Sequence, residues 1–377
     1  MQNQSIQEQT VPENVSKRIT ALRFLLAAFV VFIHNCYTTE SVKAVLMPNG
    51  EPPVFVQNEF GRWIQLFISE GLARAAVPLF FMFAAYLQAK KNDCYGTLLK
   101  KKSKSLLLPF VLWTLIYVFY YAGLKVIVLK IAPQLLDHPE NTCLSWTAAD
   151  WFHKLIGYTP DGNGGIIHPP AIAYHLWFVR DLFILSALSP LFKFLTTKFP
   201  AGIFIFALAS FLAPFNVYFV EPQAFFFYIA GLCWGIFEIP LFEKIDQIKW
   251  KELIPLFAFL FVASKTFCQS CGGLAVICSC IIFLKLSAQI IARPALFERA
   301  SYLAGFSFFL YMAHAPVLSN ILAEKIWIRI FPMSNTFFSL YEYFGVSILI
   351  VAIATALGIA LKKIFPPIFS VLNGGRN

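Results

Sequence analysis

The sequence ALRFLLAAFVVFIHN runs from Ala21 to Asn35 and is apolar except for Arg23 near its start and the polar pair that begins with His34 at its end. With its apolar neighbours it forms a stretch over Ile19–Tyr37. A helix of about 20 residues is long enough to cross a hydrocarbon core about 30 Å thick. The stretch therefore predicts a transmembrane helix that carries two ionisable side chains.

Further apolar stretches of similar length follow along the chain. They are about Leu72–Ala89, Leu106–Ile131, Tyr174–Phe192, Ala201–Val220, Gln223–Pro240, Leu253–Phe267, Leu274–Ile291, Tyr302–Ala323 and Tyr343–Leu361. Because each is close to the length of a membrane-spanning helix, we predict an all-α polytopic membrane protein with about ten transmembrane helices.

The composition agrees with a bilayer environment. Of the 377 residues, 58% are apolar and 13% are charged, whereas soluble proteins carry about 45–50% and about 25%. The mean hydropathy is +0.68. A water-soluble fold has too little interior to cover this much apolar surface. The composition therefore excludes an ordinary cytosolic enzyme, a disordered chain and a disulfide-rich secreted module.

The placement of the cations along the chain explains the net charge of +10. If the N-terminus is cytoplasmic, 19 of the 30 Lys and Arg lie on the cytoplasmic side, in segments 1–18, 90–104, 193–199, 242–252, 285–301 and 362–377. An excess of cations in cytoplasmic loops is the signature of membrane orientation. We therefore predict that both termini are cytoplasmic, with tails at 1–18 and 364–377 around a single transmembrane domain at 19–363. The expected partner is the lipid bilayer and not nucleic acid.

The longest stretch between predicted spans is an outer loop of about Ala132–Ala173, which contains Trp146, Trp151 and His153. Aromatic residues of this kind anchor a chain at the membrane interface. The alternative interpretation is that they hold a sugar.

The eight cysteines show no pairing pattern. Four of them lie in apolar spans, where a thiol behaves as a small hydrophobic group. The single C-x-x-C, at Cys268 and Cys271, lacks the second pair that a structural zinc site needs. We predict no metal site, and at most a disulfide within this pair.

Ionisable side chains inside a membrane span are costly, by about 2.5–3.5 kcal/mol at the centre, so each marks a candidate functional site. Arg23 and His34 are eleven residues apart. Eleven steps of about 100° return to within roughly 20° of the start, with a rise of about 16.5 Å. Both side chains therefore project from one helix face, the cation near the cytoplasmic edge and the base toward the outer side. The alternatives are an arginine that reaches the interface and a structural histidine bonded between helices.

A second group of cations comprises Arg74 in the second span and Lys100, Lys101, Lys102 and Lys104 in the loop after it. One interpretation is that these cations only orient the chain and contact anionic lipid headgroups. They also suit a phosphate-binding patch at a helix start, for a polyanionic donor such as coenzyme A. The two roles are compatible.

The fourth span begins with His175-Leu-Trp177-Phe-Val-Arg180-Asp181. Arg180 and Asp181 are adjacent and point about 100° apart on a helix. We therefore expect that they do not pair with each other and that each has a partner on another helix. A structural ion pair between helices is the alternative to a functional site.

Ser307, Tyr311 and His314 follow the spacing i, i+4, i+7 in the ninth span and so lie on one helix face. A second histidine with hydroxyl groups beside it can then face the interior of the bundle. The alternative is a hydrogen-bonded structural histidine.

Together these motifs resemble the membrane-bound acyltransferase family 3, whose members O-acylate bacterial surface polysaccharides. The resemblance extends from about Arg18 to Lys363 and rests on motifs in the family's order: Leu22-Arg23 with His34, Val77-Pro78-Leu-Phe-Phe81, the basic stretch Lys100–Pro109, Leu176-Trp177-Phe178, and Ser307 with Tyr311 and His314. The chain departs from the family at Ala84-Ala85, where members carry Ser-Gly, and at Thr20, where an acidic residue is common. Lysines also replace the paired arginines of the cytoplasmic loop.

The resemblance implies an O-acyltransferase of the bacterial inner (cytoplasmic) membrane. It would move an acyl group, with acetyl the first choice, from cytoplasmic acyl-CoA to a hydroxyl of a cell-surface or lipid-linked glycan. His34 would act as general base or as nucleophile. The implied catalytic residues are His34, His314 and Arg23, the cofactor-binding residues Arg74, Lys100, Lys101, Lys102 and Lys104, and the substrate-positioning residues His175, Trp177, Arg180, Asp181, Ser307 and Tyr311. The alternative is a transporter or flippase of a lipid-linked saccharide, which also places ionisable side chains inside the membrane.

Overall fold

The computed structural model of the chain describes residues 10–36, 54–131, 143–160, 166–167, 169–170, 172–213, 220–331 and 333–376. Some of the sequence predictions extend outside these residues. They are the start of the N-terminal tail, the end of the first span, part of the outer loop, part of the fifth span and the last residue of the C-terminal tail.

Helices follow one another along the chain with short connections. The α-helices are α1 (Glu13–His34), α3 (Glu59–Leu66), α4 (Ala76–Ala89), α5 (Tyr95–Lys102), α6 (Leu108–Val118), α7 (Leu124–Ile131), α8 (Ala148–Leu155), α9 (Trp177–Ala187), α10 (Ser189–Lys198), α11 (Pro200–Leu212), α12 (Pro222–Ile236), α13 (Leu241–Gln247), α14 (Trp250–Thr266), α15 (Cys271–Ile291), α16 (Pro294–Ala304), α17 (Ser307–Ala313), α18 (Ile328–Ile330), α19 (Thr336–Ile364) and α20 (Pro366–Leu372). Short 3-10 and π-helical segments are η1 (Phe67–Leu72), η2 (Ala73–Ala75), η3 (Ser103–Leu107), η4 (Phe119–Gly123), η6 (Cys143–Ser145), η7 (Tyr174–Leu176), η8 (His314–Leu318) and η9 (Asn320–Trp327). Two-residue strands, β1 (Thr159–Pro160) and β2 (Ile166–Ile167), form one antiparallel pair.

Within the described residues, the continuous helical segments that are long and apolar enough to cross a membrane number 4: Glu59–Ala89, Tyr95–Ile131, Cys271–Ile291 and Thr336–Ile364. The number rises to 7 if three bent combinations each form one span, namely α10 with α11, α12 with α13, and α16 with α17 and η8. The fold is therefore that of an all-α multi-pass membrane protein. The total of ten spans and the cytoplasmic location of both termini stay predictions.

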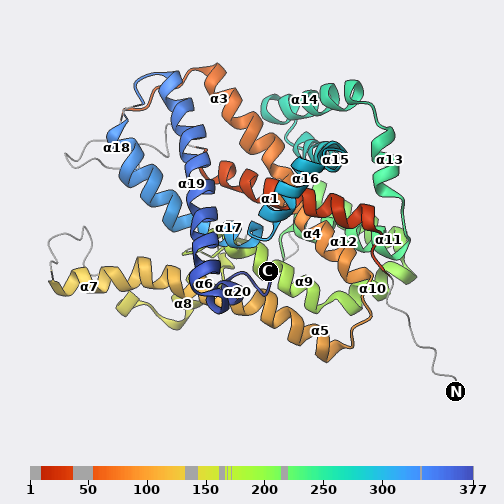
Figure 1. Cartoon of the computed structure of the whole chain (residues 1–377), viewed down its shortest axis with the longest axis horizontal. Helices are drawn as coiled ribbons and strands as arrows, with labels where there is room; N and C mark the ends of the chain where they lie inside the picture. Colours follow the sequence, from red (N-terminus) through yellow and green to blue (C-terminus); the bar gives the residue numbers. More distant parts are fainter. Residues whose placement is uncertain are drawn as a thin grey trace.

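Helix α1 has 22 residues but is absent from these segments, because Lys17, Arg18 and Arg23 interrupt its apolar sequence. It runs through the middle of the molecule (Figure 1) and contacts α15, α16 and α17 from the second half of the chain. Leu22 and Leu26, one helical turn apart, are fully buried in these contacts. The packing therefore surrounds α1 with protein on several sides, which allows its ionisable side chains to meet groups on other helices.

Helices α4 and α12 pack closely because α12 carries a Gly-x-x-x-Gly sequence. A Cβ atom on Gly231 would lie 2.2 Å from the carbonyl oxygen of Met82, so no larger residue fits. Helix backbones approach this closely only at small residues. Beside the contact, the rings of Tyr86 and Trp234 stack with their centroids 3.9 Å apart. This packing fixes α4, which forms one wall of the cavity described below.

Parts of both predicted tails are helical and packed in the structure. Helix α1 begins at Glu13, inside the predicted N-terminal tail, and Arg18 is only 1% exposed. At the other end, residues of the predicted C-terminal tail form α20 and a turn that packs into the bundle, where Phe369 is 1% and Asn373 0% exposed. Hydropathy alone does not reveal this packing, because it depends on partners elsewhere in the chain.

Candidate active site

Three histidines from distant parts of the sequence lie together. His34 is the last residue of α1, His175 lies in η7, and His314 is the first residue of η8. The ring centroids of His34 and His314 are 5.2 Å apart, and those of His175 and His314 are 5.1 Å apart. His175 and His314 are buried, and His34 is half-buried. Three separate sequence predictions thus converge on one place, which we call the histidine cluster.

The backbone after His314 explains why its side chain stands at the end of a helix. Helix α17 ends at Ala313, and Ala315 is extended, with φ −135° and ψ 159°. A residue that precedes a proline is disfavoured in the helical region, and Pro316 has no N–H to donate. The chain therefore leaves the helical path directly after His314. Ser319 Oγ donates a hydrogen bond of 2.9 Å to the freed carbonyl of His314.

Hydrogen bonds determine which ring nitrogen carries the proton in two of the histidines. His314 Nδ1 lies 2.7 Å from the carbonyl oxygen of Tyr311, and His175 Nε2 lies 3.2 Å from that of Met312. A carbonyl oxygen only accepts, so in the neutral rings these nitrogens donate. Within the described chain, His314 Nε2 and His175 Nδ1 have no hydrogen-bond partner. Each therefore keeps a lone pair, which a general base or an orienting acceptor needs.

The surroundings of His34 include an aromatic ring and a cation. Its ring packs against Tyr174, with the centroids 4.9 Å apart, and Arg74 lies close enough to interact with it electrostatically. Arg74 is held by Glu70 through contacts of 2.5 and 3.1 Å, and Lys265 lies 3.6 Å from the same carboxylate. The structure therefore places Arg74 with the histidine cluster and not with the lysine-rich segment.

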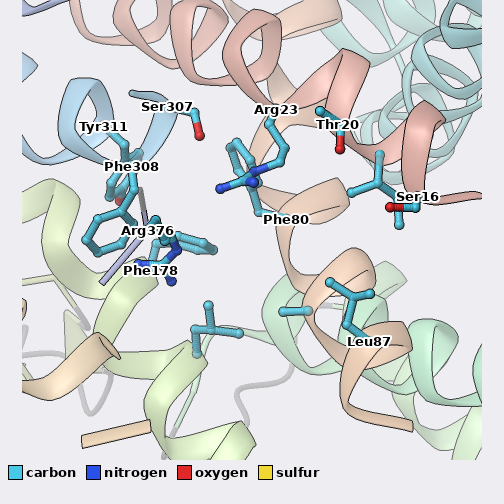
Figure 2. Close-up of a pocket in the computed structure, with 13 residues that line it drawn as sticks. Ser16, Thr20, Arg23, Phe80, Leu87, Phe178, Ser307, Phe308, Tyr311 and Arg376 are labelled. Carbon is cyan, nitrogen blue, oxygen red and sulfur yellow. The ribbon is translucent and has the colours of Figure 1, made fainter. Parts of the chain in front are cut away.

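A cavity of about 390 Å³ lies beside the histidine cluster. It is lined by Ser16, Ile19, Thr20, Arg23, Phe80, Ala84, Leu87, Phe178, Leu182, Ser307, Phe308, Tyr311 and Arg376. Figure 2 shows Arg23 reaching from α1 toward the side where Ser307, Tyr311 and Arg376 lie. The Tyr311 ring also packs on His175 and His314, with centroids 5.7 and 5.8 Å apart, so one ring separates this cavity from the cluster. We call it the cationic cavity.

Hydroxyl groups of the cationic cavity are partly occupied by backbone carbonyls. The Tyr311 hydroxyl donates to the carbonyl of His175, and Ser307 Oγ donates to that of Ala304 at 2.8 Å. The predicted common face of α17 is therefore realised only in part. Ser307 and Tyr311 line the cavity, whereas His314 packs against the other histidines.

The two arginines of the cationic cavity have no carboxylate partner among the residues that the structure describes. Arg376 Nη1 donates to the carbonyls of Ser105 and Asn373, both at 3.2 Å, and the guanidinium lies 4.0 Å from the centroid of the Phe308 ring. Burial, and then the nearby Arg23, lower the pKa of Arg376 to about 9, so it stays charged at neutral pH. Two unneutralised cations at one cavity favour an anionic ligand.

The lysine-rich segment lies outside this cavity. Lys100, Lys101 and Lys104 are exposed, and Lys101 forms an ion pair of 2.6 Å with Asp93. Lys102 is half-buried and interacts electrostatically with Arg376. Of the lysines predicted to bind a cofactor, the structure thus brings Lys102 toward the cationic cavity.

The prediction that Arg180 and Asp181 do not pair is wrong. Arg180 Nη2 lies 2.8 Å from Asp181 Oδ1, and Nε donates to the same oxygen at 2.9 Å. The long arginine side chain spans the angle that separates neighbouring positions on a helix. Asp181 Oδ2 also accepts from the backbone N–H of Glu221 at 2.9 Å, and Arg180 donates to the carbonyl of Ile156 at 2.5 Å. These bonds tie α9 to the start of α12 and to the outer loop, which is a structural role.

Trp177, predicted to position a substrate, begins α9 and packs against Phe81 of α4 with the ring centroids 6.2 Å apart. It is half-buried and is absent from the lining of the cationic cavity. The structure therefore gives Trp177 a packing contact between α9 and α4.

A second cavity, of about 410 Å³, includes a residue that packs on the histidine cluster. It is lined by Tyr121, Ala122, Lys125, Cys143, Trp146, Lys154, Ile172, Tyr174 and Pro316. Tyr174 packs on His34, and Pro316 follows His314 by two residues. Lys154 lies over the Trp146 ring, 4.9 Å from its centroid. A tyrosine of each cavity therefore packs on the cluster, Tyr311 from one and Tyr174 from the other. The predicted outer loop contributes to the second cavity, which we call the outer-loop cavity.

Two residues of the candidate site, Asn373 and Arg376, were not predicted from the sequence, because they lie in a polar segment that is typical of a tail. Asn373 Nδ2 donates to the carbonyl of Gly305 at 2.9 Å, and its Oδ1 accepts from the backbone N–H of Phe309 at 3.1 Å. This clamp brings Arg376 into the cationic cavity. The sequence Asn-Gly-Gly-Arg at 373–376 is a turn signal, but it does not say where the turn docks. Among the described residues, no group of three or more His, Cys, Asp or Glu side chains is arranged to hold a metal ion.

Comparison with known proteins identifies the class. Residues 16–369 match the model of a family described as an acyltransferase domain, so the chain belongs to this acyltransferase family. The resemblance to membrane-bound acyltransferase family 3 is thereby confirmed. Among curated proteins, the chain is 24% identical over 381 residues to the succinoglycan biosynthesis protein ExoH of Rhizobium meliloti (strain 1021), with 96% of this chain and 93% of that protein covered. None of the solved structures matches it.

Proposed function

We propose that this protein is an O-acyltransferase of a bacterial inner membrane that moves an acyl group, with acetyl the first choice, from acyl-CoA to a hydroxyl of a cell-surface or lipid-linked polysaccharide. The observation that carries the proposal is that aromatic residues of two cavities pack on the histidine cluster, and that one cavity presents Arg23 and Arg376, which have no carboxylate partner in the described chain. A transfer reaction needs a base close to both substrates, and the proposal places one substrate in each cavity.

The cationic cavity is the proposed donor side. Coenzyme A carries its negative charge on phosphates, and guanidinium groups bind phosphate through paired charge-assisted hydrogen bonds. The apolar part of the lining, including Phe80, Leu87 and Phe178, suits the pantetheine arm that leads to the thioester. The thioester would then lie near Tyr311, one ring away from the histidine cluster.

The outer-loop cavity is the proposed acceptor side. Trp146, Tyr174 and Tyr121 supply aromatic faces, and Lys125 and Lys154 supply donors, which suits a sugar. The relative ExoH is a succinoglycan biosynthesis protein, and this supports a polysaccharide as the acceptor class.

In the proposed step, one imidazole acts as general base. The acceptor hydroxyl oxygen attacks the thioester carbonyl carbon while His34 takes the hydroxyl proton. The carbon–sulfur bond then breaks, and His34 gives the proton it took from the acceptor hydroxyl to the leaving coenzyme A thiolate. An ester and free coenzyme A result.

We assign the base to His34 because it is half-buried and next to Tyr174 of the acceptor side, whereas His314 is fully buried. The lone pair on His314 Nε2 has no partner in the described chain and lies beside the His34 ring. It can accept a hydrogen bond from His34 and so fix its ring orientation. In this assignment His314 and His175 are positioning residues. The nucleophilic alternative, an acyl group carried on His34, uses the same geometry.

The decisive experiment replaces His34 by Ala. Because general-base catalysis contributes typically about 10²–10⁴-fold, we expect His34→Ala to lose at least about a hundredfold in transfer of a labelled acetyl group from acetyl-CoA to extracted glycan. The matched control is His153→Ala, a histidine of α8 outside the lining of both cavities, which we expect to retain activity. Equal membrane levels of both variants establish that folding is intact.

Acylation retained in His34→Ala would contradict the assignment of the base. Absence of any acetyl exchange between acetyl-CoA and coenzyme A, together with movement of a lipid-linked saccharide in reconstituted vesicles, would favour a transporter.

A further inference from the structure

The segment 373–376 is held in the bundle by specific hydrogen bonds. Asn373 is fully buried, and its side chain bonds to Gly305, Phe309 and the carbonyl of Arg376. Gly374 and Gly375 have φ of +66° and +72°, a left-handed conformation that favours glycine. A Cβ on Gly374 would lie 2.4 Å from the carbonyl oxygen of Ser105. The turn therefore brings Arg376 back toward the interior of the bundle.

Arg376 presents its unused donors to the cationic cavity. Its Nη1 is occupied by the carbonyls of Ser105 and Asn373, and one face of the guanidinium covers the Phe308 ring. In the described chain, Nε and Nη2 make no hydrogen bond, and Arg376 lines the cavity. Nε and Nη2 form one edge of the planar group, and this edge matches two oxygens of a phosphate.

Arg376 also connects two groups of cations that are far apart in the sequence. It interacts electrostatically with Arg23 on α1 and with Lys102 at the end of α5. Its bond to Ser105 fastens η3, the segment that directly follows Lys102. The three cations therefore form a series from the exposed lysine-rich helix into the cavity, and such a series suits a ligand with several phosphates.

The two arginines that are buried among the described residues, Arg18 and Arg180, have partners of opposite charge. Arg18 is paired with Asp246, and Arg180 with Asp181. Arg23 and Arg376 are half-buried, and a cation partly removed from water without a carboxylate is costly unless something else neutralises it. The exception made at Arg23 and Arg376 therefore points to an anion that arrives from outside the chain.

We propose that Arg376 is a donor-binding residue that holds a phosphate of coenzyme A, bidentate through Nε and Nη2. Its contact lies between those that Lys102 and Arg23 make with the charged part of the donor. This inference rests on the proposed function, because it takes acyl-CoA as the donor. A phosphate of an anionic lipid headgroup has the same chemistry, so the experiment separates the two sources.

The test measures binding of coenzyme A by calorimetry to the full chain in phosphatidylcholine nanodiscs, which contain no anionic lipid. We expect Arg376→Gln to weaken binding about ten- to a hundredfold, in line with the loss of hydrogen bonds between charged groups. Arg376→Lys keeps the charge but not the two parallel N–H donors, so its affinity for coenzyme A should lie between those of the wild type and Arg376→Gln. Gly374→Ala, which keeps the arginine but obstructs the turn, should weaken binding as well. The control is Arg299→Gln, an exposed arginine of α16, which should bind as the wild type does.

A second readout separates donor binding from a structural role. Acetyl-pantetheine carries the thioester without phosphates, so Arg376→Gln and the wild type should use it at equal rates, whereas the KM for acetyl-CoA should rise in the variant with kcat little changed. A variant that loses both activities equally would show that Arg376 only supports the fold, and this would overturn the proposal.

The remaining outcomes are equally decisive. If the wild type binds coenzyme A and Arg376→Gln binds it as tightly, the inference fails while the proposed function stands. If the wild type does not bind coenzyme A, the proposed donor fails and the inference with it. If phosphatidylglycerol in the nanodisc abolishes coenzyme A binding at saturating ligand, the site belongs to a lipid headgroup, and this too overturns the proposal.

Discussion

Arg18 and Arg23 lie on the same helix, five residues apart, and have opposite fates. The guanidinium of Arg18 makes contacts of 2.7 and 2.8 Å with the two carboxylate oxygens of Asp246, bonds to Ser287 at 2.8 Å and covers the Phe242 ring. Arg23 lines the cationic cavity and has no carboxylate partner within the described chain. Arg18 is paired within the fold, whereas Arg23 is available to a ligand.

The difference teaches how to separate structural from functional charges in a membrane protein. Both arginines lie in a largely apolar helix, where a cation is costly. Their partners distinguish the structural cation from the available one. A paired cation stabilises the contact between α1 and the α13–α15 region, whereas an unpaired cation beside a cavity raises the affinity for an anion.

Removing the partner of Arg18 should have the largest effect on the protein. Asp246→Asn leaves a guanidinium whose side chain is 2% exposed without its countercharge, and because the Asp246 side chain is itself 41% exposed, we expect a cost of at most about 3 kcal/mol. We expect a clear fall in Tm and in the yield of monodisperse protein. Glu13→Gln removes an exposed pair on the same helix, with Lys17, and should change stability by less than about 1 kcal/mol. Equal Tm values for the two variants would contradict the comparison.

Removing Arg23 should have the reverse profile. Arg23→Gln eliminates an unneutralised cation, so we expect Tm to stay the same or rise, while kcat/KM for acetyl-CoA falls about ten- to a hundredfold through lost phosphate contacts. The measurement is transfer kinetics beside thermal unfolding of the same preparation. A variant that unfolds like Asp246→Asn would place Arg23 among the structural arginines.

A smaller effect is expected at Arg180, which has two carboxylates near it, those of Asp181 and Glu221. Glu221 lies next to the Arg180–Asp181 pair, and burial, then the Asp181 charge, raise its pKa to about 7 against the opposing effect of Arg180. The folded state thus favours the neutral carboxyl. Its contribution to stability is complete below the unfolded pKa of about 4.3 and is lost as the pH rises through about 7.

We therefore expect Glu221→Gln to raise Tm at pH 8 relative to the wild type and to make little difference at pH 5. After a reduction for solvent screening, the expected difference in the free energy of unfolding is about 1 kcal/mol. Thermal unfolding across this pH range, with the exposed Glu298→Gln as control, provides the check. A constant difference at all pH values would mean that Glu221 does not titrate in this window.

The smallest effect is expected at the exposed lysines. Lys100, Lys101 and Lys104 lie outside the cationic cavity, and Lys101 already has Asp93 as a partner. Changing the three to Gln should raise the KM for acetyl-CoA less than about threefold, because exposed charges contribute little. A change of tenfold or more would restore the lysine-rich segment as the main donor site and weaken the case for the cavity.

Much of the fold was predictable because apolar length is a local property. The stretches that gave the second, third, eighth and tenth spans lie within the four segments long and apolar enough to cross a membrane. The breaks were less predictable. The ninth span bends by 51° between α16 and α17, and the bend that divides α10 from α11 is 118°. Pro200 lies at the break between α10 and α11, and Gly305 lies at the break between α16 and α17, but how far a chain turns there depends on what it packs against.

The candidate site was predictable residue by residue but not as a site. His34, His175 and His314 stood out because each is an ionisable group in an apolar setting. Their convergence depends on the packing of α1, η7 and η8. The mistaken expectation for Arg180 and Asp181 came from Cβ directions, which do not account for the reach of a long side chain.

The sequence by itself determined that this chain is an all-α membrane protein, which residues inside its spans are ionisable, and that its motifs follow the order of an acyltransferase family. Tertiary structure alone decided which of those charges are neutralised. Arg18 meets Asp246 across 228 residues of sequence, and Arg376 reaches Ser105 across 271. Charge neutralisation is a matter of a few ångströms between side chains on different helices. No local pattern contains that distance, so the division between paired and available arginines exists only in the folded molecule.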